Sequence, residues 1–224
     1  MADDLSYIRK WLRRGRSKDG KTLDLSNRKI NNEICAELAE NLVAEGLEVL
    51  FLHNNKIKDE GLEELAECEL FSSLKELWMY ENKIGNEGIQ ALADSPNVTK
   101  LRCLSLYTNR IGDEGAIAIA NSEYLRRLES LDLSFNRIGD AGAVALSQSE
   151  NLGRLQTLHL DANKIGLEGM NALATAKGLE SLTHLHLLYN KIEPEGLNML
   201  RESPRLRKLE TIKCDLYPEI PEGC

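Results

Sequence analysis

The sequence predicts an α/β fold, a curved solenoid with a parallel concave sheet of about eight strands and α-helices on its convex side. Two observations support this prediction. Apolar residues at every second position, typical of a short strand, give way in each unit to apolar residues at helical spacing. Six asparagines recur between the two patterns at a fixed interval of 27 residues, which indicates a repeat array. They are Asn55, Asn82, Asn109, Asn136, Asn163 and Asn190.

Each repeat is predicted to begin with a strand and to continue into a helix. Leu104 and Leu106 alternate with other residues, as in a strand with one buried face. A helix is indicated where Ile89, Leu92 and Ala93 follow a glycine placed six residues after the asparagine. Such units, joined in one direction, must stack as a parallel sheet. Because strands lie ~4.8 Å apart while helices need ~10 Å, we expect the stack to bend with its strands inside.

The two ends of the array depart from the repeat pattern, as capping units do. Residues 1–20 are predicted to hold a capping helix, over residues 3–14, with Leu5, Ile8 and Leu12 on one face. Residues 21–208 then form seven repeats, and residues 209–224 form a C-terminal cap. The whole chain, residues 1–224, is therefore expected to be a single domain.

The recurring asparagines have a structural reason to be there. A side-chain amide can satisfy backbone groups where a strand turns, and we expect stacked copies to bond to one another along the array. We interpret these residues as part of the scaffold and not as a binding site.

Composition excludes several classes of function and location. The net charge of -8 argues against nucleic acid as a partner, since that binding depends on Lys and Arg. The chain lacks the apolar stretch of a secretory signal or a membrane span, which predicts a soluble protein without a membrane role. Five cysteines, with Cys35 and Cys214 at core positions, favour a reduced, cytoplasmic protein. If the protein is injected into a host cell, its location would be the cytosol of that cell. We also expect the protein to be a monomer.

The repeated phrase gives the family resemblance. Segments such as LRCLSLYTNRI from Leu101 and LESLDLSFNRI from Leu128, each followed by a glycine-led helix, resemble the leucine-rich repeat. The period of 27 is similar to that of its ribonuclease-inhibitor-like class, whose horseshoes have α-helical convex sides. This family includes nuclease inhibitors, GTPase-activating proteins, actin-capping proteins and immune sensor domains. The resemblance implies binding but does not select a ligand.

The repeat register identifies the strand residues that face the concave side. All four histidines and six of the eleven aromatic residues fall in these positions. Phe51, His53, Trp78, Tyr80 and Tyr107 are predicted to form one patch on neighbouring strands. Aromatic side chains exposed on a rigid surface are typical of a protein-binding hot spot. The alternative is that a C-terminal tail or a second copy covers the patch, and we favour a partner.

The C-terminal half of this face carries a different set of side chains. Asp132, His159 and His186 share one position on adjacent strands, with Asp161 and His184 beside them. Imidazoles and a carboxylate on neighbouring strands, which lie ~5 Å apart, could ligate zinc and support hydrolysis. We favour a polar, pH-sensitive part of the binding face, because no metal-binding motif accompanies them. Neither a metal nor a cofactor is assigned.

We therefore predict a protein without catalytic activity that binds a protein partner on its concave face. The predicted contact residues also include Phe135 and Tyr189, which directly precede repeat asparagines. No nucleotide-binding loop, catalytic triad or nucleophile motif is present in the sequence. The alternative from the family is a regulatory GTPase-activating protein, although no residue here can be matched to that activity.

Overall fold

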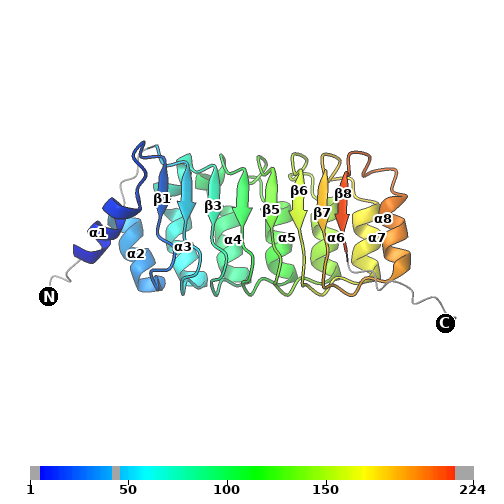
Figure 1. Cartoon of the computed structure of the whole chain (residues 1–224), viewed down its shortest axis with the longest axis horizontal. Helices are drawn as coiled ribbons and strands as arrows, with labels where there is room; N and C mark the ends of the chain where they lie inside the picture. The colour runs from blue at the N-terminus through cyan, green and yellow to red at the C-terminus, as the bar shows by residue number, and fades with distance from the viewer. Residues whose placement is uncertain (1–5, 42–45, 215–224) are drawn as a thin grey trace, which may run out of the picture.

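The computed structural model describes residues 6–41 and 46–214, and its centre is one parallel sheet. The eight strands follow one another in chain order across the sheet, so that each pairs with the next repeat's strand (Figure 1). They are β1 (Thr22–Asp24), β2 (Val49–Phe51), β3 (Glu76–Trp78), β4 (Cys103–Ser105), β5 (Ser130–Asp132), β6 (Thr157–His159), β7 (His184–His186) and β8 (Thr211–Lys213).

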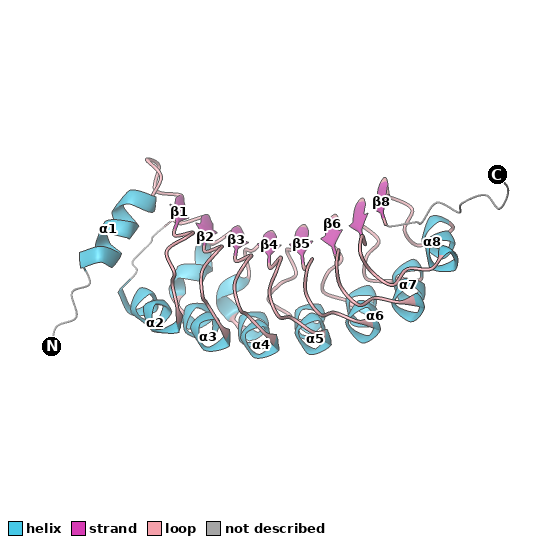
Figure 2. Cartoon of the chain, turned by 60° about the horizontal axis from the view of Figure 1, so that its bottom comes forward, coloured by secondary structure: helices cyan, strands magenta, loops and turns pink. Residues whose placement is uncertain are grey.

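Helices follow the strands and form a second layer. Figure 2 shows the strands along the inner side of an arc and helices α2 to α8 along its outer side. The helices are α1 (Ser6–Gly15), α2 (Asn32–Asn41), α3 (Asp59–Glu67), α4 (Asn86–Asp94), α5 (Asp113–Asn121), α6 (Asp140–Gln148), α7 (Leu167–Ala174) and α8 (Pro194–Arg201), with the short 3-10 helices η1 (Glu69–Ser73) and η2 (Pro96–Val98). The predicted curved α/β solenoid with eight strands is confirmed.

The strand register agrees with the spacing of the sequence. Leu104 lies opposite Leu131, and Leu131 lies opposite Leu158, so paired residues differ by 27 in number. These leucines are fully buried between sheet and helices, together with helix residues such as Ile119 and Leu146. The core therefore runs the length of the array as one continuous layer.

The repeat asparagines bond to backbone groups, as predicted, but not in the pattern that was expected. The Nδ2 of Asn136 donates to the carbonyl oxygens of Leu106 and Leu133, each at 3.0 Å. Its Oδ1 accepts from the backbone N–H of Ile111 at 3.0 Å. The expectation that stacked asparagines bond directly to one another is therefore wrong here. Neighbours share an acceptor instead, because the Leu133 oxygen also accepts from Asn163.

A second set of hydrogen bonds, which was not predicted, links the start of one helix to the start of the next. We call it the helix-capping ladder. Asp113 begins α5, and its Oδ1 accepts from the backbone N–H groups of Gly139 at 2.7 Å and Gly142 at 2.9 Å, at the start of α6. Each of these helices is thus capped by the helix before it, where a carboxylate also favours the positive end of the helix dipole. Asn86 caps α5 and Asp140 caps α7 in the same way.

The helix-capping ladder depends on close approach between helices and ends before α8. A Cβ on Gly142 would lie 2.8 Å from the Asp113 Oδ1 and 3.0 Å from the Ala116 Cβ, so a larger residue would displace the capping side chain. Leu167 occupies the equivalent position in α7 and has no side-chain acceptor. Helix α8 begins instead at Pro194, whose ring suits a first helical position without an N–H.

Helix α1 lies against the N-terminal end of the array. Ile8 is buried, and Trp11 and Leu12 are half-buried against the core. The Arg28 guanidinium lies 5.8 Å from the centre of the Trp11 ring, a distance suited to a cation–π contact. Of the predicted end units, Leu5 and residues 215–224 lie outside the described residues.

Candidate functional site

The strands place the predicted aromatic residues side by side on the concave face. Phe51 on β2 lies opposite Trp78 on β3, because each follows a buried leucine at the same register position. Two residues further along, His53 and Tyr80 occupy the next outward position, since alternate strand residues face the same side. Tyr107 follows β4 at the position equivalent to Tyr80.

Six rings form a continuous chain of contacts, which we call the aromatic strip. Phe51 stacks on Trp78 with centroids 5.9 Å apart, and His53 stacks on Tyr80 at 4.2 Å with nearly parallel planes. Edge-to-face contacts complete the series. Its members are Phe51, His53, Trp78, Tyr80, Tyr107 and Phe135. The strip therefore extends from β2 to the end of β5 as one preformed surface.

Phe135 and Tyr189 are the most exposed of the predicted rings, with 45% and 68% of their surface accessible. Both have a left-handed backbone, with φ of 55° and 58°. A bulky residue rarely adopts this conformation, which asparagine or glycine would occupy at lower cost. Glu81, Thr108 and Ala162 share this backbone at the equivalent positions, so the repeat itself sets the conformation.

Carboxylates lie next to the N-terminal part of the aromatic strip. The indole N–H of Trp78 donates to Glu76 at 3.1 Å, which fixes the ring on the strand surface. Burial lowers the pKa of His53, although the nearby charges of Asp24 and Glu81 oppose this shift. Glu76 was not among the predicted site residues. Its position two residues before Trp78 on the same strand is the signal that could have identified it.

Three of the predicted residues form a second group, the His/Asp cluster, which consists of His159, Asp161 and His186. Their potential ligand atoms all lie within 4.8 Å of one another. The His186 Nδ1 is 3.9 Å from the Asp161 Oδ2, and the two imidazole rings have centroids 4.1 Å apart. The side chains of His186 and Asp161 are only 14% and 17% exposed, so both are largely sheltered from solvent.

The surroundings keep His186 in its neutral form at pH 7. The pKa of His186 is lowered to about 4, mainly by burial and also by the nearby positive charges of His159, Lys213 and His184, while Asp132 opposes the shift. Burial also raises the pKa of Asp161, although its hydrogen bond from the Leu188 backbone N–H opposes the shift. The contact between His186 and Asp161 is consequently not an ion pair at neutral pH.

The low pKa of His186 predicts a loss of stability in mild acid. An unfolded chain takes up the proton near pH 6.5, whereas the native state resists it down to about pH 4. Lowering the pH through this window therefore favours unfolding. We expect His186→Gln to lose less stability than the wild type when urea unfolding is compared at pH 7 and pH 4.5. An NMR titration that gave His186 a midpoint near pH 6.5 would contradict this expectation.

The remaining predicted residues lie near the His/Asp cluster but are engaged elsewhere. The Asp132 Oδ1 accepts from the backbone N–H of Ser134 at 2.9 Å. The His184 Nδ1 contacts the Thr183 hydroxyl at 2.8 Å. The structure thus selects three residues from the five that the sequence grouped together.

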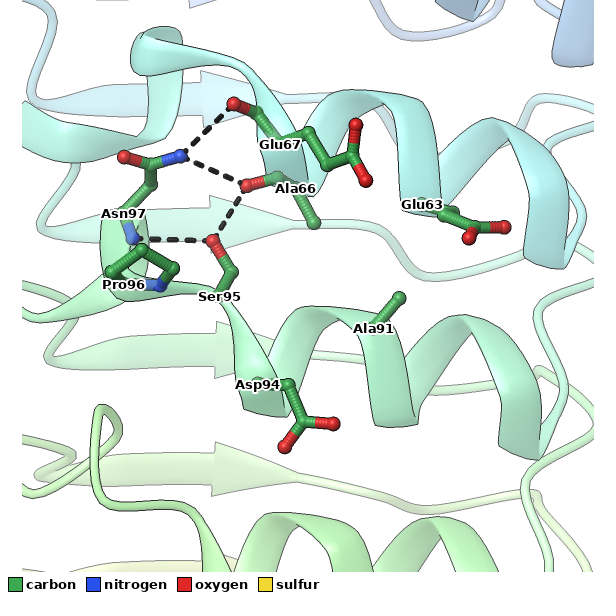
Figure 3. A pocket seen from close by; sticks show the side chains of 8 residues that line it. All are labelled: Glu63, Ala66, Glu67, Ala91, Asp94, Ser95, Pro96 and Asn97. Carbon is green, nitrogen blue, oxygen red and sulfur yellow. Dashed lines mark hydrogen bonds between the residues drawn. The ribbon is translucent and has the colours of Figure 1, made fainter.

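A hollow on the helical side of the molecule, between α3 and α4, carries no comparable arrangement. Glu63, Glu67 and Asp94 line it together with Ser95 and Asn97 (Figure 3). The Ser95 hydroxyl donates to the Ala66 carbonyl, and the Asn97 amide donates to the carbonyls of Ala66 and Glu67. These polar groups tie neighbouring repeats together, which accounts for them without a ligand.

The two cysteines that were predicted at core positions lie in or against the core. Cys35 is buried, and this burial raises the pKa of its thiol to about 12, so it behaves as a small apolar side chain. Cys214 is half-buried against the core. Among the helices in the described part of the chain, none has the length and apolar character to cross a membrane.

Solved structures of bacterial proteins share this fold. Internalin F from Listeria monocytogenes is similar with 25% sequence identity and a TM-score of 0.53, over 87% of this chain and 53% of the other. Internalin C2 from the same organism is similar with 21% identity and a TM-score of 0.50, over 87% of this chain and 80% of its own. This chain therefore spans about half the length of the internalin F structure. No curated protein sequence matches it.

The repeat itself identifies the family. A family model of the leucine-rich repeat matches six segments that together make up more than half of the chain. They are residues 47–66, 72–93, 99–120, 125–147, 155–174 and 178–200. Each segment includes one complete strand and all or most of the helix that follows it. The chain belongs to the leucine-rich-repeat family.

Proposed function

We propose that this protein is a non-catalytic recognition module that binds a protein partner through its concave face. The aromatic strip is the observation that carries the proposal. Six rings, which lie on or just after four successive strands, are held in mutual contact. Binding would therefore immobilise few additional rotamers. Aromatic anchors at the centre of a rigid surface are the usual hot spots of protein interfaces.

The exposure of two large rings, Phe135 and Tyr189, supports the same conclusion. Phe135 and Tyr189 occupy the position immediately before a repeat asparagine, where Asn54 stands in an earlier repeat. Asn54 has the same left-handed backbone and uses its amide to bond to Asn27 at 2.6 Å. Glu81, Thr108 and Ala162 also have this backbone, so the fold accepts different side chains at this position. Because the fold does not require a large ring there, contact with a partner accounts for the two exposed rings.

The charges around the strip suggest the partner's chemistry. Glu76, Asp24 and Glu81 lie beside Trp78 and His53, so apolar contacts are bordered by carboxylates. Such a surface complements a segment with apolar and basic side chains. In the C-terminal half, Asp132, the His/Asp cluster, His184 and Tyr189 would then add specificity.

The proposal includes a class, a location and an oligomeric state. Convex α-helices and the 27-residue register favour the ribonuclease-inhibitor-like class. Cys35, Cys68 and Cys103 are free thiols, which supports a reducing compartment such as the cytoplasm. The net charge of -8 supports a partner other than nucleic acid. A single-domain monomer with its concave face open to the partner completes the proposal.

The test removes two central rings of the strip at once. We expect Trp78→Ala combined with Tyr80→Ala to weaken partner binding by at least about 100-fold, since each central aromatic contributes about 2 kcal/mol or more. Immobilised wild type would first capture partners from the native cell, and their affinities would then be measured with purified proteins. Circular dichroism would verify that the double variant remains folded.

Tyr124→Ala is the matched control, because this ring lies on the loop after α5 and is 37% exposed. It should retain every partner at the wild-type affinity. If the folded double variant also retains every partner, the concave face is not the binding surface.

A further inference from the structure

We propose that His159, Asp161 and His186 form a binding site for a divalent transition-metal ion of the Zn²⁺ type. The site goes beyond the protein-binding function proposed above and does not depend on it. It would use three protein ligands and leave one coordination position open to water or to a group of another molecule.

The ligand set suits such an ion. Two imidazole nitrogens and one carboxylate oxygen lie within 4.8 Å of one another. Imidazole favours zinc, copper, nickel and cobalt over magnesium or calcium, which prefer sites built from oxygen alone. Three ligands of this kind with a vacant fourth position also match the general pattern of open zinc sites.

The distances require only small side-chain adjustments. Zinc ligands at about 2.0–2.1 Å from the ion place neighbouring donor atoms about 3.3 Å apart in a tetrahedron. The observed 3.9 Å between the His186 Nδ1 and the Asp161 Oδ2 is already close to this value. Rotation of the two imidazoles about their side-chain bonds can bring the third donor in without moving the strands.

The backbone orients the carboxylate for this role. The Asp161 Oδ1 accepts from the Leu188 backbone N–H at 2.7 Å, which leaves Oδ2 directed toward His186. The Asp161 backbone N–H in turn donates to the Ser134 hydroxyl at 3.2 Å. Such supporting bonds hold a ligand in position and are typical of built metal sites.

The two histidines of the site are held by a rigid scaffold. His159 and His186 lie opposite each other on the paired strands β6 and β7, so their separation is set by the sheet. Asp132 lies opposite His159 on β5, and Lys213 lies opposite His186 on β8. The negative charge of Asp132 favours a bound cation, and the flexible, exposed Lys213 can extend away from it.

The test uses the full chain after removal of metal by a chelator. Titration with Zn²⁺ alone, followed by calorimetry, should show one equivalent bound in the micromolar range or tighter, and thermal unfolding should shift upward. Co²⁺ should give the visible absorption of a four-coordinate site without the near-ultraviolet band of a thiolate ligand. The spectrum thereby separates this site from the cysteines.

Two ligand variants and one control variant test the assignment. His186→Ala and Asp161→Asn should each weaken Zn²⁺ binding by about 100-fold or more, as loss of a direct ligand exceeds the effect of a supporting residue. His184→Ala is the matched control, because it lies two residues away on the same strand but contacts Thr183. It should bind one equivalent as the wild type does. Circular dichroism establishes that each variant is folded.

Each of three results would overturn the proposal. The first is a wild type that binds no Zn²⁺ at a concentration of about 100 μM, where even weak sites are occupied. The second is a folded His186→Ala variant with unchanged affinity. The third is a thiolate band in the Co²⁺ spectrum, which would assign the bound metal to cysteine.

Discussion

Replacing Asn163 by alanine is expected to lower the free energy of unfolding by about 3 kcal/mol, because buried polar groups lose their partners. Asn163 is 9% exposed and lies inside the array, between β6 and α7. Its Oδ1 accepts from the backbone N–H of Ile138 at 3.0 Å, and its Nδ2 donates to the carbonyls of Leu133 and Leu160 at 3.0 and 3.1 Å.

The groups released by this change are not equally affected. The Leu133 carbonyl still accepts from Asn136, and the Leu160 carbonyl still accepts from Asn190. The Ile138 N–H has no such second partner among its described bonds, and the missing side chain also leaves a gap. Most of the expected cost therefore comes from one buried donor and the lost packing.

Gln90→Ala is the control for the Asn163 prediction. Gln90 is exposed on α4, and its side chain bonds only to Asp94 at 2.8 Å among the bonds described for it. Its replacement should change stability by less than about 0.5 kcal/mol. Urea unfolding of the three proteins gives the comparison. An Asn163→Ala variant as stable as Gln90→Ala would show that the asparagine ladder is dispensable.

A single added methyl group at Gly178 is expected to cost about 3 kcal/mol, through overpacking against the backbone. A Cβ there would lie 2.0 Å from the Ser149 carbonyl oxygen and 2.9 Å from its carbonyl carbon. Backbone atoms cannot rotate away as a side chain can. The Gly178 N–H also donates to the Ser147 carbonyl at 3.1 Å, which holds the two segments together.

Gly153→Ala is the matched control for Gly178→Ala, since both glycines lie between a helix and the following strand. No heavy atom lies within 4 Å of a Cβ placed at Gly153. Alanine there should leave stability unchanged or raise it by up to about 1 kcal/mol, by restricting the unfolded chain. Equal midpoints for the two variants in urea would contradict the predicted difference.

The fold could be predicted almost completely from the sequence, because two periodicities determine it. Alternation places Leu104 and Leu106 on the buried face, and the interval of 27 aligns Leu104 with Leu131. Register follows from these numbers without knowledge of any side-chain angle. The asparagine bonds were only partly predictable, since the sequence does not show that neighbours share a carbonyl instead of pairing.

The sequence predicted which residues of the candidate site face the concave side, but it did not predict which of their side chains touch. Sequence placed Phe51 beside Trp78, but which rings stack depends on side-chain rotamers. Likewise, it grouped His184 with His186, and the structure separates them because Thr183 engages His184. Residue type and spacing therefore indicate a surface, while local hydrogen bonds decide which members act together.

The helix-capping ladder had a sequence signal that is easily overlooked. Its residues recur at the same interval as the asparagines but vary in type. They are Asn32, Asp59, Asn86, Asp113 and Asp140. Each caps the following repeat and not its own, so a search for caps within a single helix does not find them.

The helix-capping ladder runs in one direction along the chain, from each repeat to the next one synthesised. The side chain that caps each helix from α4 to α7 belongs to the repeat before it, which is synthesised earlier. Folding during synthesis can therefore extend one repeat at a time onto a finished end. A deletion from the N-terminus would uncap the next helix, whereas a deletion from the C-terminus would leave every remaining cap in place.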